Sequence, residues 1–148
     1  MREQWDDFMV AAIQQFKLAL TTEDQKRLDY SAASLDFVEQ WLRDRYLDIE
    51  LVDKVNQSIF LGAAFYVGET YRRHLNWCWK VDMSHFDSND PLSYDAAQVL
   101  PDCDKPDVSG DLSNIIMPVE DVIEAIHARP PFLFFRTTLE ATLKGPQA

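Results

Sequence analysis

The chain has 148 residues, of which 25 are acidic and 14 are lysine or arginine, so its formal net charge is −11. Apolar residues make up 47% of the composition, which is typical of a globular domain with a buried core and excludes a disordered chain. The negative charge argues against direct binding to nucleic acid or to an anionic membrane surface, because both need basic residues, and it favours a basic protein as partner.

The first half of the chain has the apolar spacing of three helices. Apolar residues recur three and four positions apart over residues 5–20, which predicts one face of a first helix. Residues 21–24 are expected to end that helix and to start a short turn of another. The spacing returns over residues 35–46, and Ser34 is predicted to be the N-cap of this helix. A third helix is expected over residues 48–74.

Short strands are predicted after the third helix. Asn76 is expected to stop the helix, and residues 77–81 (WCWKV) have the aromatic and β-branched content of a strand. A long acidic loop follows, with further short strands expected at residues 97–100 and 114–117.

Two helices are predicted at the C-terminal end. Pro118 suits the first position of a helix, and Pro130–Pro131 is expected to end it. Residues 132–143 read as a last helix closed by Gly145. Together the elements predict a single α+β domain over residues 1–148, mostly α, in which the N-terminal helices pack with a small sheet and the C-terminal helices.

The excess negative charge is concentrated in one part of the chain. Residues 81–124 hold 11 acidic residues and one basic residue, and residues 81–113 are interpreted as an acidic, loop-rich insertion of the domain. The alternative is that these acids only solvate a loop, because charge runs usually need no partner. The predicted partner-binding residues are the aspartates of this segment, Asp87, Asp90, Asp95, Asp102, Asp104, Asp107 and Asp111.

The most hydrophobic run of the chain ends in a cluster of charges. Glu69 precedes Arg72 by three positions and Arg73 by four, which is the spacing of ion pairs on a helix. One interpretation is structural: a buried helix reaches the surface, pairs its charges and ends. The other is a pocket in which Glu69 acts as a general base and Arg73 anchors an anion. The residues of that pocket would be Tyr66, Glu69, Arg72, Arg73 and Trp77.

No metal or cofactor motif is apparent in the sequence. His74 and Cys78 lie four apart, but the helix is expected to end between them, and zinc sites usually have tighter ligand pairs. The acidic residues 102–107 are not followed by the glycine and glutamate of an EF-hand loop. We therefore expect no metal and no cofactor. The lack of a G-x-S-x-G motif and of a phosphate-binding glycine loop weighs against an enzyme.

The two cysteines, Cys78 and Cys103, are too few to define a disulfide scaffold. They could pair, but the expected state is two reduced thiols in a cytoplasmic protein. The N-terminal residues include acids where a signal peptide would be apolar, and no run approaches the roughly 20 apolar residues of a membrane span. The sequence therefore predicts a cytoplasmic protein with no membrane contact, and it leaves homo-oligomerisation open.

Residues 62–77 (GAAFYVGETYRRHLNW) resemble a pattern of small uncharacterised bacterial proteins. In that pattern a helix reading G-x-[YF]-x-G-E-x-x-x-R is followed by a strand that carries a tryptophan. The chain departs from it in the acidic insertion and at Asn76, where the pattern has glycine. Some of these proteins look like immunity proteins of toxin systems, and the resemblance supplies no catalytic residues.

Together with the charge, the resemblance implies a non-enzymatic immunity or antitoxin-like protein. Its acidic surface in residues 82–124 would neutralise a basic protein partner, such as a nuclease-type toxin that itself binds phosphate. The alternative is a small enzyme or ligand-binding domain with its pocket around Tyr66, Glu69 and Arg73.

Overall fold

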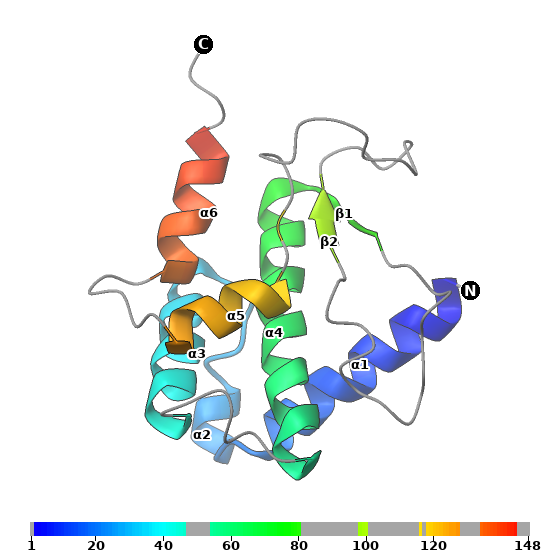
Figure 1. The fold of residues 1–148 in the computed structure, drawn as a ribbon, viewed down its shortest axis with the longest axis vertical. Helices are drawn as coiled ribbons and strands as arrows, with labels where there is room; N and C mark the ends of the chain where they lie inside the picture. Colours follow the sequence, from blue (N-terminus) through cyan, green and yellow to red (C-terminus); the bar gives the residue numbers. More distant parts are fainter. Residues whose placement is uncertain are drawn as a thin grey trace.

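The computed structural model describes residues 2–46, 54–80, 98–100, 116, 118–127 and 134–144. Six helices account for 78 of these 97 residues, so the prediction of a mostly helical protein is confirmed. They are α1 (Arg2–Leu18), α2 (Thr22–Gln25), α3 (Ala32–Arg45), α4 (Lys54–Leu75), α5 (Pro118–His127) and α6 (Phe134–Lys144) (Figure 1). Within the described residues, no helix is both long enough and apolar enough to cross a membrane.

Helix α4 is the centre of the packing. It has no charged residue between positions 55 and 68, and residues 60–71 are all buried. Figure 1 shows α4 in green with α1 crossing it on one side and α3 and α6 on the other. The crossing with α1 is close, because a Cβ atom at Gly62 would lie 2.0 Å from the carbonyl oxygen of Ala12. A hydrophobic helix surrounded by others in this way needs no polar face.

The strands form a two-stranded antiparallel ribbon. In it β1 (Cys78–Lys80) pairs with β2 (Gln98–Leu100), so that Trp79 lies opposite Val99. Val99 also exchanges two backbone hydrogen bonds with Ile116, at 2.8 and 2.9 Å. The strands predicted at 77–81 and 97–100 are therefore confirmed at residues 78–80 and 98–100, whereas Trp77 precedes the strand. The sheet of an α+β domain is not, because three residues per strand and one isolated bridge make only a ribbon in the described part of the chain.

Three predicted helix boundaries agree with the structure. Asn76 ends α4 in the left-handed region with a φ of 56°, which asparagine adopts more readily than most residues. Pro118 is the first residue of α5. Thr21 caps α2, because its hydroxyl accepts a hydrogen bond from the Asp24 amide at 3.1 Å. The predicted helix start at residue 48 and the predicted ends at Pro130–Pro131 and Gly145 lie outside the described residues.

The predicted N-cap of the next helix was wrong by three residues. Ser31 is the cap of α3, and its hydroxyl accepts a hydrogen bond from the Ser34 amide at 3.1 Å. The side chain of Ser34 lies inside the first turn instead. Its hydroxyl donates to the Ser31 carbonyl at 2.6 Å and accepts a hydrogen bond from the Tyr66 hydroxyl at 2.8 Å. A buried partner on α4 therefore explains this serine better than a cap does.

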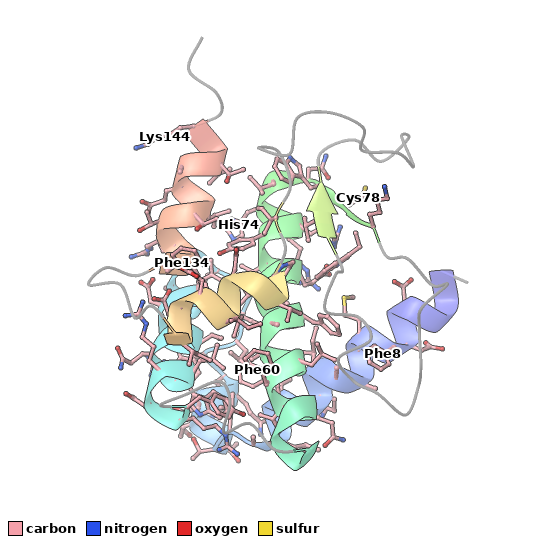
Figure 2. The ribbon with its side chains drawn as sticks, in the orientation of Figure 1. Phe8, Phe60, His74, Cys78, Phe134 and Lys144 are labelled. Atoms are coloured by element: carbon pink, nitrogen blue, oxygen red, sulfur yellow. The ribbon has the colours of Figure 1, made fainter. Side chains whose placement is uncertain are left out.

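The expectation of reduced thiols was also wrong. Cys78, on β1 and labelled in Figure 2, is disulfide-bonded in the structure, because no cysteine among the described residues is free. The other cysteine of the chain is Cys103, which lies outside the described residues. Cys78 lies opposite Leu100 across the ribbon, and Leu100 is three positions before Cys103 in the sequence.

Candidate functional site

Glu69 on α4 is a buried carboxylate, 7% exposed, that accepts four hydrogen bonds. Arg72 donates two of them, from Nε to Oε1 at 2.5 Å and from Nη2 to Oε2 at 3.0 Å. Arg73 Nε donates to Oε2 at 3.3 Å. Trp79 on β1 donates from Nε1 to Oε1 at 3.1 Å. Both helix-spaced pairs of the sequence analysis are present, and a tryptophan of the ribbon joins them.

The surroundings of Glu69 keep it ionised. Burial by itself would raise the pKa of Glu69, but the hydrogen bonds from Arg72 and Trp79 and the charge of Arg72 outweigh it, and the pKa lies below its ordinary value. A general base at neutral pH needs a pKa nearer to 7 and a lone pair free for the substrate's proton. Glu69 therefore suits an anchor for arginines better than it suits a base.

Arg73 and two tyrosines form a stack beside this carboxylate. The Arg73 guanidinium lies 3.7 Å from the centre of the Tyr30 ring. On its other side the Tyr30 ring stacks on Tyr66, with 4.7 Å between the ring centres. Burial raises the pKa of both tyrosines, so both hydroxyls are neutral at physiological pH. The Arg73 guanidinium is therefore the one charged group of the stack formed by Arg73, Tyr30 and Tyr66.

Tyr30 holds an unusual backbone conformation in this stack. Its φ is 60°, which is rare for a bulky residue and is maintained only by surrounding contacts. Its amide donates to the Tyr66 hydroxyl at 2.9 Å. Its carbonyl accepts a hydrogen bond from His74 Nε2 at 2.8 Å, at the end of α4 (Figure 2). The connection between α2 and α3 is thereby fixed to α4.

The structure places the predicted pocket residues in different surroundings. Tyr66 and Glu69 are buried and bonded, whereas Arg72 and Arg73 reach the surface beside them. Trp77 packs partly buried against the core, and Trp79 rather than Trp77 contacts the carboxylate. One turn before Tyr66 on α4, Gly62 packs directly against α1, so this part of the helix face is not open to a ligand. The seven aspartates predicted to bind a partner all lie outside the described residues.

A second buried carboxylate was missed by the sequence analysis. Glu39 of α3 is fully buried and is paired with Arg43 one turn further along the helix. It also accepts hydrogen bonds from the amides of Phe134 at 2.9 Å and Phe135 at 2.7 Å, the first two residues of α6. The carboxylate thus accepts hydrogen bonds from amides that have no partner within the helix at its N-terminus, and its negative charge interacts favourably with the positive end of the helix dipole.

Tyr71 connects this second carboxylate site to α4. Its hydroxyl donates to the Phe135 carbonyl at 3.0 Å. Complete burial raises the pKa of Tyr71 well above its ordinary value, and the charges of Asp121 and Glu39 raise it further. The tyrosine is therefore a neutral donor, and a polar network joins α3, α4 and α6.

Comparisons of the chain with protein-family models, curated proteins and solved structures find no match. The resemblance to bacterial immunity-type proteins therefore remains a prediction.

Glu69→Gln is expected to lower the stability at pH 7 by about 1.5–3 kcal/mol, because hydrogen bonds from charged groups are lost. The lowered pKa of Glu69 fixes the pH dependence. Its ionised form contributes stability that is complete above the pKa of an unfolded glutamate, about 4.3, and is lost as the pH falls through the folded pKa. The difference between the variant and the wild type should therefore be largest at neutral pH and shrink in acid.

Urea unfolding at several pH values measures this difference. Glu23→Gln is the matched control, because Glu23 pairs with Lys26 on the surface of α2 and should change stability by less than about 0.5 kcal/mol. A Glu69→Gln curve that runs parallel to the wild type at all pH values would contradict the expected ionisation of Glu69.

Proposed function

We propose that the protein is a non-enzymatic acidic binding protein of the immunity or antitoxin type, which neutralises a basic protein partner, such as a toxin, through an acidic surface in residues 82–124. The distribution of charge is the observation that carries this proposal. Residues 81–124 contain 11 acidic and one basic side chain, a net charge of −10, whereas the whole chain carries −11. The rest of the chain therefore holds a net charge of −1.

The chemistry of the helices supports a binding role over catalysis. Glu69 and Glu39 are the deeply buried carboxylates of the described residues, and each accepts hydrogen bonds from three residues. Their partners hold helices, the ribbon and the α2–α3 connection together. Both carboxylates are occupied by these structural partners, and the pKa of Glu69 is lowered rather than raised as a general acid or base would require.

The separation of charge also suggests what the partner looks like. A nearly neutral helical body can carry an acidic segment without strong repulsion inside its own core, and the segment then attracts a basic patch over a distance of about 8 Å at physiological ionic strength. A toxin that binds phosphate would have such a patch. Attraction of this kind acts mainly on the rate of association and weakens with salt.

Charge reversal tests the proposal. A tagged chain is used to capture partners from its host at low and at moderate salt, and the association rate of the captured protein is then measured. Changing Asp102, Asp104 and Asp107 together to lysine should slow association by about tenfold or more and flatten its salt dependence. The matched control reverses three exposed acids that lie outside residues 82–124, Asp7, Asp44 and Glu140. Equal effects of the two triple variants would refute the acidic surface as the binding site.

The disulfide of Cys78 bears on where the protein works. Disulfides persist in oxidising compartments and are rare in the cytosol. We therefore propose an oxidising compartment in place of the cytoplasm that the sequence suggested. When the protein is isolated from its host and denatured without reductant, alkylation should label neither cysteine. Two alkylated thiols per chain would instead support a cytoplasmic location.

A further inference from the structure

The Arg73 side chain is held in place but keeps one edge open. Its Nε donates to Glu69, and its guanidinium plane covers the Tyr30 ring. The side chain is nevertheless 49% exposed. Its two terminal nitrogens make no hydrogen bond to the described residues, so a pair of parallel N–H donors remains available to a ligand.

Two arginines share the carboxylate next to Arg73. One carboxylate, Glu69, serves the guanidinium groups of both Arg72 and Arg73. Arg72 takes the shorter contacts with both oxygens and also experiences the charge of Asp6 on α1. Among the described residues, Glu69 is the one acid that pairs with Arg73. Among the described residues, Arg73 therefore has no carboxylate to itself, because it shares Glu69 with Arg72.

The position of Arg73 is also prepared in advance. A free arginine side chain samples many rotamers, and a binding event that orders it has to overcome the entropy of that freedom. Here the ring beneath the guanidinium is itself fixed, because Tyr66 and His74 hold both peptide groups of Tyr30. Ligands bind more tightly to a group whose ordering precedes the binding.

We propose that Arg73 is a preformed anchor for an oxyanion, either a carboxylate or a phosphate group. Two oxygens of such a group match the spacing of the two terminal nitrogens, and charge-assisted pairs of this geometry are stronger than neutral hydrogen bonds. The anchor is distinct from the acidic surface, because it selects the opposite charge. It lies where α4 ends, next to the α2–α3 connection.

Arg27 provides an internal control. Its guanidinium also lies over an aromatic ring, that of Phe37 at 4.4 Å, and Arg27 is exposed. Within the described part of the chain no ion pair fixes it. If exposure and a ring were sufficient for anion binding, Arg27 would bind anions as well as Arg73 does.

Side-chain Nε–Hε signals of the labelled full chain report binding at each arginine. The protein is titrated with sodium phosphate and, separately, with sodium acetate, while sodium chloride is exchanged to keep the ionic strength constant. We expect a saturable shift of the Arg73 signal, with an apparent affinity at least five times that at Arg27. Saturation by phosphate alone would identify a phosphate site, and saturation by acetate would identify a carboxylate site.

Two variants refine the test. Arg73→Lys keeps the charge but loses the pair of donors, so the saturable shift of the neighbouring Tyr30 amide should weaken at least fivefold. Arg73→Gln should abolish it. Thermal unfolding shows whether each variant is folded; if Arg73→Gln is not, the comparison of Arg73 with Arg27 in the wild type decides alone. The proposal is overturned if neither anion shifts Arg73 more than Arg27.

Discussion

Replacing Glu39 with alanine is expected to lower the free energy of unfolding by about 3–5 kcal/mol, the loss typical of removing one partner of a buried ion pair. Three groups lose their acceptor at once: the Arg43 guanidinium, which is 13% exposed, and the amides of Phe134 and Phe135. None of them can turn to bulk water without opening the contact between α3 and α6. Glu39→Gln should fall between alanine and the wild type, because the amide oxygen can still accept from the helix.

Urea unfolding followed by circular dichroism measures this loss, and hydrogen exchange locates it. Protection should fall first along α6, since its N-terminus is the part released, and last along α1. Glu140→Ala is the matched control, because Glu140 is an exposed glutamate of α6 whose nearest base, Arg136, is 3.8 Å away. It should cost less than about 0.5 kcal/mol. Similar losses for Glu39→Ala and Glu140→Ala would show that the carboxylate does not hold α6.

Gly62→Ala is expected to lower stability by about 3 kcal/mol, at the upper end of the range for overpacking a core. Glycine to alanine within a helix usually adds about 1 kcal/mol, so propensity alone predicts the opposite sign. The added Cβ would lie 2.0 Å from the Ala12 carbonyl oxygen and 2.9 Å from Phe16 Cβ. The closest atom belongs to a helix backbone, which cannot rotate out of the way, so α1 has to move off α4.

Gly68→Ala is the informative comparison for this variant. Its Cβ would meet the Trp79 ring at 2.3 Å and Pro118 Cγ at 2.6 Å, both of them side-chain atoms. That variant should disturb the ribbon and alter tryptophan fluorescence, whereas Gly62→Ala should reduce hydrogen-exchange protection in α1. A Gly62→Ala protein as stable as the wild type would mean that α1 and α4 cross at a greater distance.

Features fixed by neighbouring residues could be predicted from the sequence. Thr21, Asn76 and Pro118 determine helix ends through their own side chains or backbone angles, and the structure has them where the local signals placed them. The pairs from Glu69 to Arg72 and Arg73 follow from helix spacing alone. What the spacing could not show is that Trp79 and Tyr30 join this cluster, because those contacts depend on where the ribbon and the α2–α3 connection pack.

Features that join distant parts of the chain were missed for the same reason. Glu39 gave a signal that could have been used, since it lies on the apolar stripe of α3 between Leu35 and Leu42, one turn before Arg43. The amides that donate to Glu39, however, are 95 and 96 positions away, and no local pattern points to them. The disulfide of Cys78 depends in turn on a strand register that pairs residue 78 with residue 100.

That register has a consequence for how the chain can change over time. Lys80 and Gln98 are direct partners in the ribbon, so the segment between them starts and finishes at one point on the helical body. The entropy of closing a chain segment changes slowly with its length, by about 0.6 kcal/mol for each doubling. Residues 81–97 hold four aspartates and neither lysine nor arginine. Insertions or deletions there can therefore retune the total charge of the protein almost independently of its fold.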